Sequence, residues 1–289
     1  MNTRSTAAVA LVVTGLACQE VGAALAFHLF PQAGPLGMVM LRLVFSAVVL
    51  LLIARPRWRG HTREAWIAVL RFGAVLALMN GLFYLALERL PLGVAVTIEV
   101  LGPLVLSIVA SRRASSWVWA GLAFLGVLAL GGGGWDRLDP LGVVFALGAA
   151  ASWALYILAS ARVGAAFPRL DGLAFAMTVG AVLSLPFGIA NAGPALLRLD
   201  LLALGAAVAI LSSTIPYALE LMALRRLPAS AFAILMSLAP ATAALAGFVL
   251  LGQHLVPLEL VGIALVIGAS IGAVRAAGRH AREAAEPVG

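Results

Sequence analysis

The sequence between two long apolar stretches reads Ala86-Leu87-Glu88-Arg89-Leu90-Pro91, and it recurs as Ala223-Leu224-Arg225-Arg226-Leu227-Pro228. The same offset of 137 residues carries other proline-containing pieces onto one another: Pro103 onto Pro240, Leu101 onto Leu238, and Phe30-Pro31 onto Phe167-Pro168. One short apolar match means little, but a single offset that serves several of them indicates an internal repeat. We therefore expect two related halves, residues 1–137 and 138–276, followed by a tail at 277–289.

The composition around this repeat is that of a membrane protein. Hydrophobic residues make up 63% of the chain and charged residues 11%, whereas soluble domains hold about 45–50% and about 25%. The mean hydropathy is +1.08, which excludes a soluble enzyme, a disulfide-stapled secreted module and a disordered chain. Backbone polar groups inside a bilayer must be paired within helices or closed barrels, and the Leu/Ala/Val/Gly runs do not alternate in polarity. We predict an all-α integral membrane protein.

Ten stretches have the length of a membrane span, for which a helix needs about 20 apolar residues. They lie near 7–28, 35–54, 66–88, 92–111, 116–134, 140–162, 171–191, 200–222, 229–250 and 257–276. One repeat offset moves a residue five spans along the chain. Because five is odd, the two halves must cross the membrane in opposite directions. The prediction is therefore ten transmembrane helices arranged as two inverted five-helix repeats, a pattern typical of secondary transporters.

The distribution of arginine predicts the orientation, since the chain contains no lysine. With the N-terminus inside, the cytoplasmic segments hold fourteen arginines: Arg4, Arg55, Arg57, Arg59, Arg63, Arg112, Arg113, Arg162, Arg169, Arg225, Arg226, Arg275, Arg279 and Arg282. The opposite side holds three: Arg89, Arg137 and Arg198. Short cytoplasmic loops carry the excess of basic residues. We expect a multi-pass protein of a bacterial inner membrane with both termini in the cytoplasm and with Asp136, Asp139 and Asp200 outside.

The charged residues singled out inside the predicted spans are Glu20, Arg42, Glu99 and Glu220. Such residues are costly in a bilayer and are functional candidates. With Asn80, the first three lie roughly 10–13 Å below the outer boundary at 1.5 Å rise per residue. Two acids facing one arginine leave one acid available to a proton or to a cationic substrate group. The alternative is that Arg42 only neutralises Glu99 or Glu20 and locks the helices together.

Aromatic and proline residues complete the candidate site. Gln19, Tyr84, Trp153, Tyr156 and Tyr217 are further candidates for a substrate cavity, with core packing as the alternative for Trp153 and Tyr156. Pro103, Pro216 and Pro240 fall inside spans, where they free backbone carbonyls and act as hinges.

Glu220 and the residues one repeat offset away from the other three charges indicate which half contains the charged centre. Glu220 and Arg226 are expected to pair near the inner face. The repeat mates of Glu20, Arg42 and Glu99 are uncharged (Ile157, Val179 and Met236), so the charged centre belongs to the first half.

The motifs of soluble enzymes and metal sites are missing. Cys18 is the single cysteine, the four histidines are scattered, and the chain has no G-x-S-x-G, H-E-x-x-H or P-loop. We therefore expect no metal, no cofactor and no enzymatic activity. The basic balance is explained by the membrane rather than by nucleic acid.

The chain resembles the EamA-domain exporters of the drug/metabolite transporter superfamily, and most of all their threonine/homoserine exporter branch. The matching motifs are Leu41-Arg42-Leu43, Met79-Asn80-Gly81-Leu82-Phe83-Tyr84-Leu85, Pro91-Leu92-Gly93-Val94-Ala95, Glu99-Val100-Leu101-Gly102-Pro103, Ser152-Trp153-Ala154-Leu155-Tyr156-Ile157-Leu158 and Ile215-Pro216-Tyr217-Ala218-Leu219-Glu220. An aromatic amino acid exporter is a more distant relative on the same fold. The resemblance implies a basket of ten helices around a central cavity. Ala239 and Gln253 stand where the family often has glutamate, which leaves Glu99 as the membrane acid for coupling.

Together these features predict an amino acid exporter that works by alternating access, with threonine, homoserine or broader neutral and aromatic substrates. The alternatives are a drug or other metabolite exporter on the same fold and, less favoured, a membrane-embedded enzyme. The expected partners are a small-molecule substrate and the lipid bilayer, and no feature indicates an obligatory protein partner.

Overall fold

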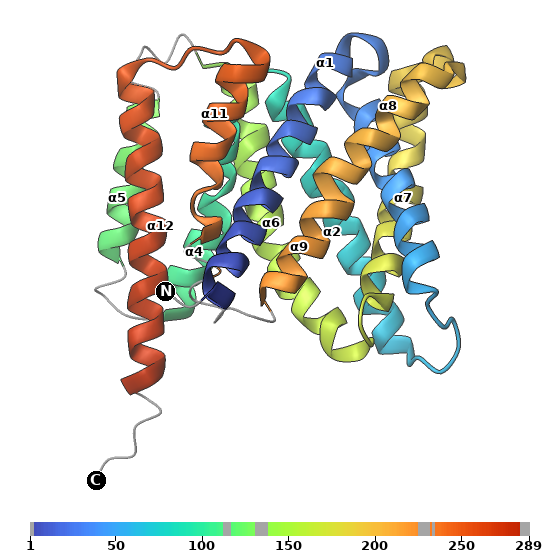
Figure 1. Ribbon diagram of the computed structural model, residues 1–289, viewed down its shortest axis with the longest axis horizontal. Coiled ribbons are helices and arrows are strands. Elements are labelled where there is room, and N and C mark those ends of the chain that lie inside the picture. The colour runs from blue at the N-terminus through green and yellow to red at the C-terminus, as the bar shows by residue number, and fades with distance from the viewer. Residues whose placement is uncertain (1–2, 112–116, 131–137, 225–231, 233–234, 284–289) are drawn as a thin grey trace.

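The computed structural model describes residues 3–111, 117–130, 138–224, 232 and 235–283 (Figure 1). The helices in these ranges are α1 (Thr3–Ala54), α2 (Arg63–Leu87), α3 (Leu92–Glu99), α4 (Leu101–Ser111), α5 (Trp117–Leu130), α6 (Pro140–Ala166), α7 (Asp171–Ala192), η3 (Gly193–Leu197), α8 (Leu199–Ala209), η4 (Ile210–Thr214), α9 (Ile215–Leu224), α11 (Ala239–Leu251) and α12 (Pro257–Glu283). Within the described ranges the chain forms helices and their connections, without a strand. The prediction of an all-α protein is confirmed there.

Six helical stretches are long and apolar enough to cross a membrane: Val9–Ala54, Arg63–Leu87, Leu92–Val109, Pro140–Ala166, Asp171–Leu197 and Pro257–Ala276. Three shorter apolar helices, Trp117–Leu130, Leu199–Thr214 and Ala239–Leu251, accompany them in the described part of the chain. Many of their large apolar side chains point outward, as expected where the surrounding medium is lipid rather than water.

Helix α1 contains two predicted spans and is broken between them at Gly34. Gly34 has φ 67° and ψ 165°, a conformation that glycine adopts without steric cost. The helix restarts at once, because Asn191 at the end of α7 accepts hydrogen bonds from the amides of Leu36 at 3.0 Å and Gly37 at 3.4 Å. These amides begin a helix and have no partner within it. In Figure 1 the blue ribbon reverses direction here.

Three predicted spans are interrupted rather than continuous. The span 92–111 breaks at Val100 between α3 and α4, the span 200–222 contains the π-helical segment η4, and the span 229–250 restarts as α11 at Ala239. A proline follows each interruption within four residues: Pro103, Pro216 and Pro240. Proline has no N–H for the carbonyl four residues earlier and clashes with it. The prolines therefore explain why these spans are not single α-helices.

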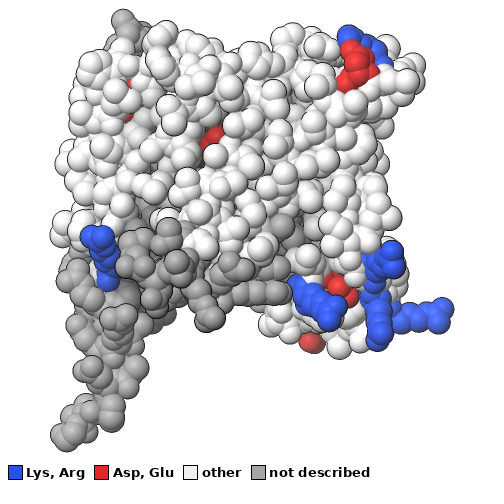
Figure 2. Space-filling view, in the orientation of Figure 1, with Lys and Arg blue, Asp and Glu red and all other residues white. Residues whose placement is uncertain are grey.

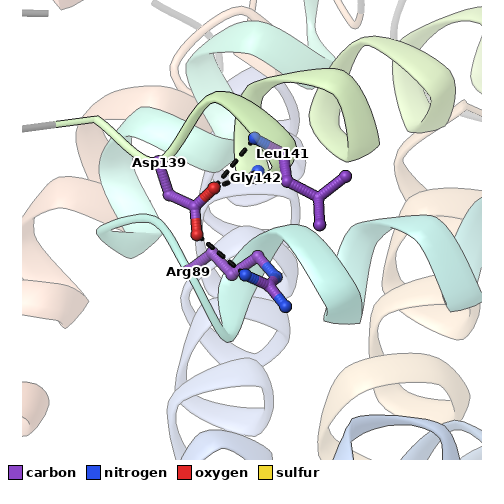
Figure 3. A network of polar contacts seen from close by, with 4 residues as sticks. All are labelled: Arg89, Asp139, Leu141 and Gly142. Atoms are coloured by element: carbon purple, nitrogen blue, oxygen red, sulfur yellow. Dashed lines mark hydrogen bonds and ion pairs between the residues drawn. The ribbon is translucent and has the colours of Figure 1, made fainter. Parts of the chain in front are cut away.

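The helices pack mainly across the two halves of the chain. Helix α1 runs along α7, α2 along α6, α3 along α11 and α5 along α12, while α8, η4 and α9 also pack on α1. Close to the connection between α2 and α3, Arg89 donates a hydrogen bond of 2.8 Å to Asp139 (Figure 3). Asp139 also caps α6 by accepting from the amides of Leu141 and Gly142. This contact ties the two halves together at one end.

Candidate functional site

A cavity of about 560 Å³ lies between the two halves, within the range of small-molecule sites. Its walls come from α1, α2, α3, α4, α6, α11, α12 and the segment before α11. The lining residues are Gln19, Glu20, Ala23, Arg42, Met79, Asn80, Phe83, Val96, Glu99, Val100, Pro103, Leu104, Ser107, Trp153, Tyr156, Ile157, Phe232, Met236, Ser237, Ala239, Ser270, Ala273 and Val274. Eight of the candidate residues named from the sequence share this wall: Gln19, Glu20, Arg42, Asn80, Glu99, Pro103, Trp153 and Tyr156.

The cavity wall carries both signs of charge. Glu20 is 2% exposed and Arg42 is 8% exposed, and both line the cavity together with Glu99. Glu20 interacts electrostatically with Glu99 and with Arg42. Charges removed from water are expensive unless other groups compensate them. Two acids and one arginine at one wall therefore form a polar centre that can hold a ligand with both charges.

The guanidinium of Arg42 is held by groups from two other helical segments. Its Nε donates to the Ser213 hydroxyl at 3.1 Å, its Nη2 to the Ser212 carbonyl at 3.0 Å, and its Nη1 to the Tyr84 hydroxyl at 3.4 Å. Pro216 stands four residues after Ser212 and has no N–H to offer that carbonyl. The acceptor that the proline leaves open is therefore used by Arg42, which links α1 in the first half to η4 in the second.

Tyr84 lies behind Arg42 and not on the cavity wall. Its side chain is 0% exposed, and its ring centre is 5.6 Å from the guanidinium carbon of Arg42. The ring also packs on Phe30, with 5.6 Å between centroids. This placement corrects the prediction of Tyr84 as a lining residue: Tyr84 supports the arginine that lines the cavity.

Glu99 occupies the last position of α3, where the helix is interrupted. Pro103 lines the cavity just beyond it and supplies no N–H to the Glu99 carbonyl. Between them, Gly102 touches α6 so closely that an added Cβ would lie 1.9 Å from the Ala150 carbonyl oxygen. Because only glycine permits this approach, the break in span four is pressed against the helix that carries Trp153 and Tyr156.

The neutral candidates lie around the charged centre. Asn80 is 4% exposed and its amide donates to the Leu76 carbonyl at 2.8 Å. The Tyr156 ring packs on Phe72 with 5.1 Å between centroids, so this tyrosine both lines the cavity and packs in the core.

Four further residues named from the sequence are not among the described residues that line the cavity. The Tyr217 and Glu220 side chains and the whole of Arg226 lie outside the described residues. Pro240 is buried at the start of α11, beside the lining residue Ala239.

Several lining residues were not among the sequence candidates. Phe83 follows Asn80 by three residues, Met79 precedes Phe83 by four, and Ser107 follows Pro103 by four. Helical spacing from the named candidates therefore identifies them. Ser237 and Ser270 lie in the last two predicted spans, where none of the charged candidates lies.

Comparison with known proteins gives three kinds of match. The EamA-like transporter family matches residues 140–275. The threonine/homoserine exporter RhtA of Escherichia coli (strain K12) is 40% identical over 267 residues, covering 91% of this chain and 90% of the relative. RhtA of Salmonella typhimurium (strain LT2) is 40% identical over 256 residues, covering 88% and 86%. The uncharacterized transporter YwfM of Bacillus subtilis (strain 168) is 29% identical over 254 residues, covering 82% and 83%.

One solved crystal structure shares the fold, with a TM-score of 0.65 at 19% identity, covering 93% of this chain and 98% of the other. The identity to the Escherichia coli exporter extends over 91% of the chain. The chain therefore belongs to the EamA-like transporter family of the drug/metabolite transporter superfamily.

Proposed function

We propose that this protein exports amino acids across a bacterial inner membrane, with threonine, homoserine or related neutral amino acids as substrates. The observation that carries the proposal is the cavity wall that combines Glu20 and Glu99 with Arg42. The 40% identity to the threonine/homoserine exporters over 91% of the chain supports the same substrate class.

The cavity chemistry suits a zwitterion. In this proposal, Glu99 pairs with the substrate ammonium and the positive field of Arg42 attracts the substrate carboxylate. Trp153 and Tyr156 contribute apolar surface for the side chain, and Asn80 contributes an amide. The second acid, Glu20, is the candidate for a proton or for a second contact to the ammonium. A cavity of this volume also accommodates a larger metabolite or a drug. The recognition of charge is therefore the feature that separates the candidate substrates.

The proposed architecture is two inverted five-helix repeats that alternate access to the cavity. The helix breaks at Val100 and before Ala239 support it, because each precedes one of two prolines, Pro103 and Pro240, that are one repeat offset apart. The contacts between halves also pair equivalent spans, such as α3 with α11 and α5 with α12. Pro103, Pro216 and Pro240 are the proposed hinges of the movement.

The proposed orientation has both termini in the cytoplasm. Figure 2 supports it, since most of the basic side chains on the visible face, together with some acidic ones, gather along one end, while the opposite end shows a small cluster of both signs. The exposed pair Arg198–Asp200 is at the start of α8, on the side assigned to the periplasm. A basic cytoplasmic side is the usual rule for inner-membrane proteins.

The decisive variant is Glu99→Gln, because the amide keeps the size of the side chain and removes its charge. We expect it to melt like the wild type in detergent and to lose at least tenfold in threonine counterflow in proteoliposomes. The matched control is Glu259→Gln, which changes a buried carboxylate outside the cavity that accepts from the Val256 amide of its own segment. Glu259→Gln should transport normally.

Glu20→Gln, measured beside it, separates the two acids. Normal counterflow by well-folded Glu99→Gln contradicts the role of this carboxylate. Exchange of lipophilic cations without amino acid exchange replaces the proposal by drug export. Chemical conversion of a lipid substrate would indicate a membrane-embedded enzyme.

A further inference from the structure

A second hollow lies on the outside of the bundle, away from the cavity described above. It is an open groove of about 470 Å³ lined by Glu64, Ile67, Ala68, Arg71, Ala159 and Arg162. The residues come from α2 and α6, which pack side by side. The small side chains of Ala68 and Ala159 leave room between the helices. The transport cycle proposed above makes no use of this groove.

The two arginines of the groove are well placed for an anion. Arg71 and Arg162 are both exposed. Neither takes part in a salt bridge between described residues. Glu64 lies in the first turn of α2, where a carboxylate is stabilised by the amino end of the helix. One acid against two arginines leaves the groove with a net positive charge.

The depth of the arginines matches the region of lipid headgroups. Arg162 lies four residues before the end of α6, and Arg71 lies eight residues after the start of α2. The predicted spans here are 66–88 and 140–162, so Arg162 stands at the boundary and Arg71 lies five residues, roughly 8 Å, inside it. The long side chain of arginine reaches the phosphate layer from this depth.

The surface next to the arginines, toward the middle of the membrane, is apolar and exposed. Leu78 on α2 is 54% exposed, and Leu155 and Leu158 on α6 are 52% and 46% exposed. They continue the helix faces of Arg71 and Arg162, because they follow or precede them at spacings of four and seven. A phosphate site thus adjoins a strip that suits acyl chains.

We propose that this groove binds an anionic phospholipid, with its phosphate between Arg71 and Arg162 and its acyl chains along Leu78, Leu155 and Leu158. Basic pockets between membrane helices bind such headgroups by charge, and the adjoining apolar strip selects a lipid over a free phosphate. The site is independent of the amino acid cavity, because it lies on the outer surface of α2 and α6.

Native mass spectrometry of the delipidated protein in detergent tests the proposal. We expect phosphatidylglycerol to bind more tightly than phosphatidylethanolamine. Arg71→Gln and Arg162→Gln should each weaken phosphatidylglycerol binding roughly fivefold and together about thirtyfold, which corresponds to about 1 kcal/mol per arginine. The matched control Arg275→Gln removes the same charge from an exposed position on α12 and should bind like the wild type. The double lysine variant, Arg71→Lys with Arg162→Lys, should retain most of the affinity.

Three results would overturn the proposal. The first is equal binding of both lipids by the wild type. The second is unchanged phosphatidylglycerol binding by the double glutamine variant with a wild-type melting curve. The third is competition by free glycerol phosphate at the concentrations at which the lipid binds, which would indicate a site for soluble phosphate instead.

Discussion

Replacing Arg42 by alanine should destabilise the protein strongly, and the contacts of this residue give the size of the effect. The substitution removes three hydrogen bonds from a charged donor, to Ser213, to the Ser212 carbonyl and to Tyr84. Each such bond contributes about 1.5–3 kcal/mol. Because the two hydroxyls can turn to other acceptors or to water in the cavity, we expect a net loss of about 3–5 kcal/mol. The melting temperature in detergent should fall by roughly 6–20 °C.

A second substitution tests the reason for this loss. Pro216→Ala returns an N–H to the helix, so that the Ser212 carbonyl gains a donor other than Arg42. Arg42→Ala should then cost at least about 1 kcal/mol less in the Pro216→Ala background than in the wild type. Arg275→Ala, which removes an exposed arginine from α12, should change the melting temperature little. If Arg42→Ala melts with the wild type, or costs the same in both backgrounds, Arg42 does not stabilise the protein through this carbonyl.

Three further predictions concern topology, packing and pH. Cysteine at Arg59 should resist an impermeant maleimide in intact cells while cysteine at Asp200 reacts, and the reverse labelling would invert the orientation. Gly102→Ala forces a Cβ against a carbonyl of α6 and should lower the folded yield severely. The control Gly121→Ala, in open space on α5, should be neutral or stabilising by up to about 1 kcal/mol. Equal folded yields of the two variants would contradict the packing of Gly102 on α6. The hydrogen bond from the Arg89 guanidinium lowers the pKa of Asp139, so its contribution is present above the ordinary aspartate pKa and lost as pH falls through the lowered value. The stability difference between wild type and Asp139→Asn should therefore shrink on acidification, as thermal melts between pH 7 and pH 3 would measure.

The residues of the charged centre could be identified from the sequence. Glu20, Arg42, Glu99 and Asn80 stand at similar depths in four predicted spans, and all four line one cavity. This prediction succeeds because a charge is so costly in hydrocarbon that it must face an interior space. A shared helix face does not ensure a shared depth. Tyr84 shares a helix face with Asn80, yet its position roughly 6 Å further along α2 puts it past the cavity and against Arg42.

The hydrogen-bond acceptors of Arg42 could not be predicted from the sequence, for a physical reason. Ser212 and Ser213 are two of many serines in apolar helices, where a hydroxyl ordinarily bonds the carbonyl of the preceding turn. Ser212 does this with Val208 at 2.6 Å, while its own carbonyl serves Arg42. Pro216 was recognised as a residue that frees a carbonyl, but hydropathy alone does not indicate which side chain from another helix will reach it.

The cap that Asn191 places on the restarted helix of α1 has a consequence for biosynthesis. The amides of Leu36 and Gly37 donate to the side chain of Asn191, which lies 155 residues after Leu36 in the chain. At about 5–20 residues per second, a ribosome needs roughly 8–30 s to reach it. Until then these two amides lack the Asn191 acceptor that they have in the folded protein. A fragment that ends before α7 would never receive the cap, so the amino-terminal hairpin attains its final form only when translation is well into the second half.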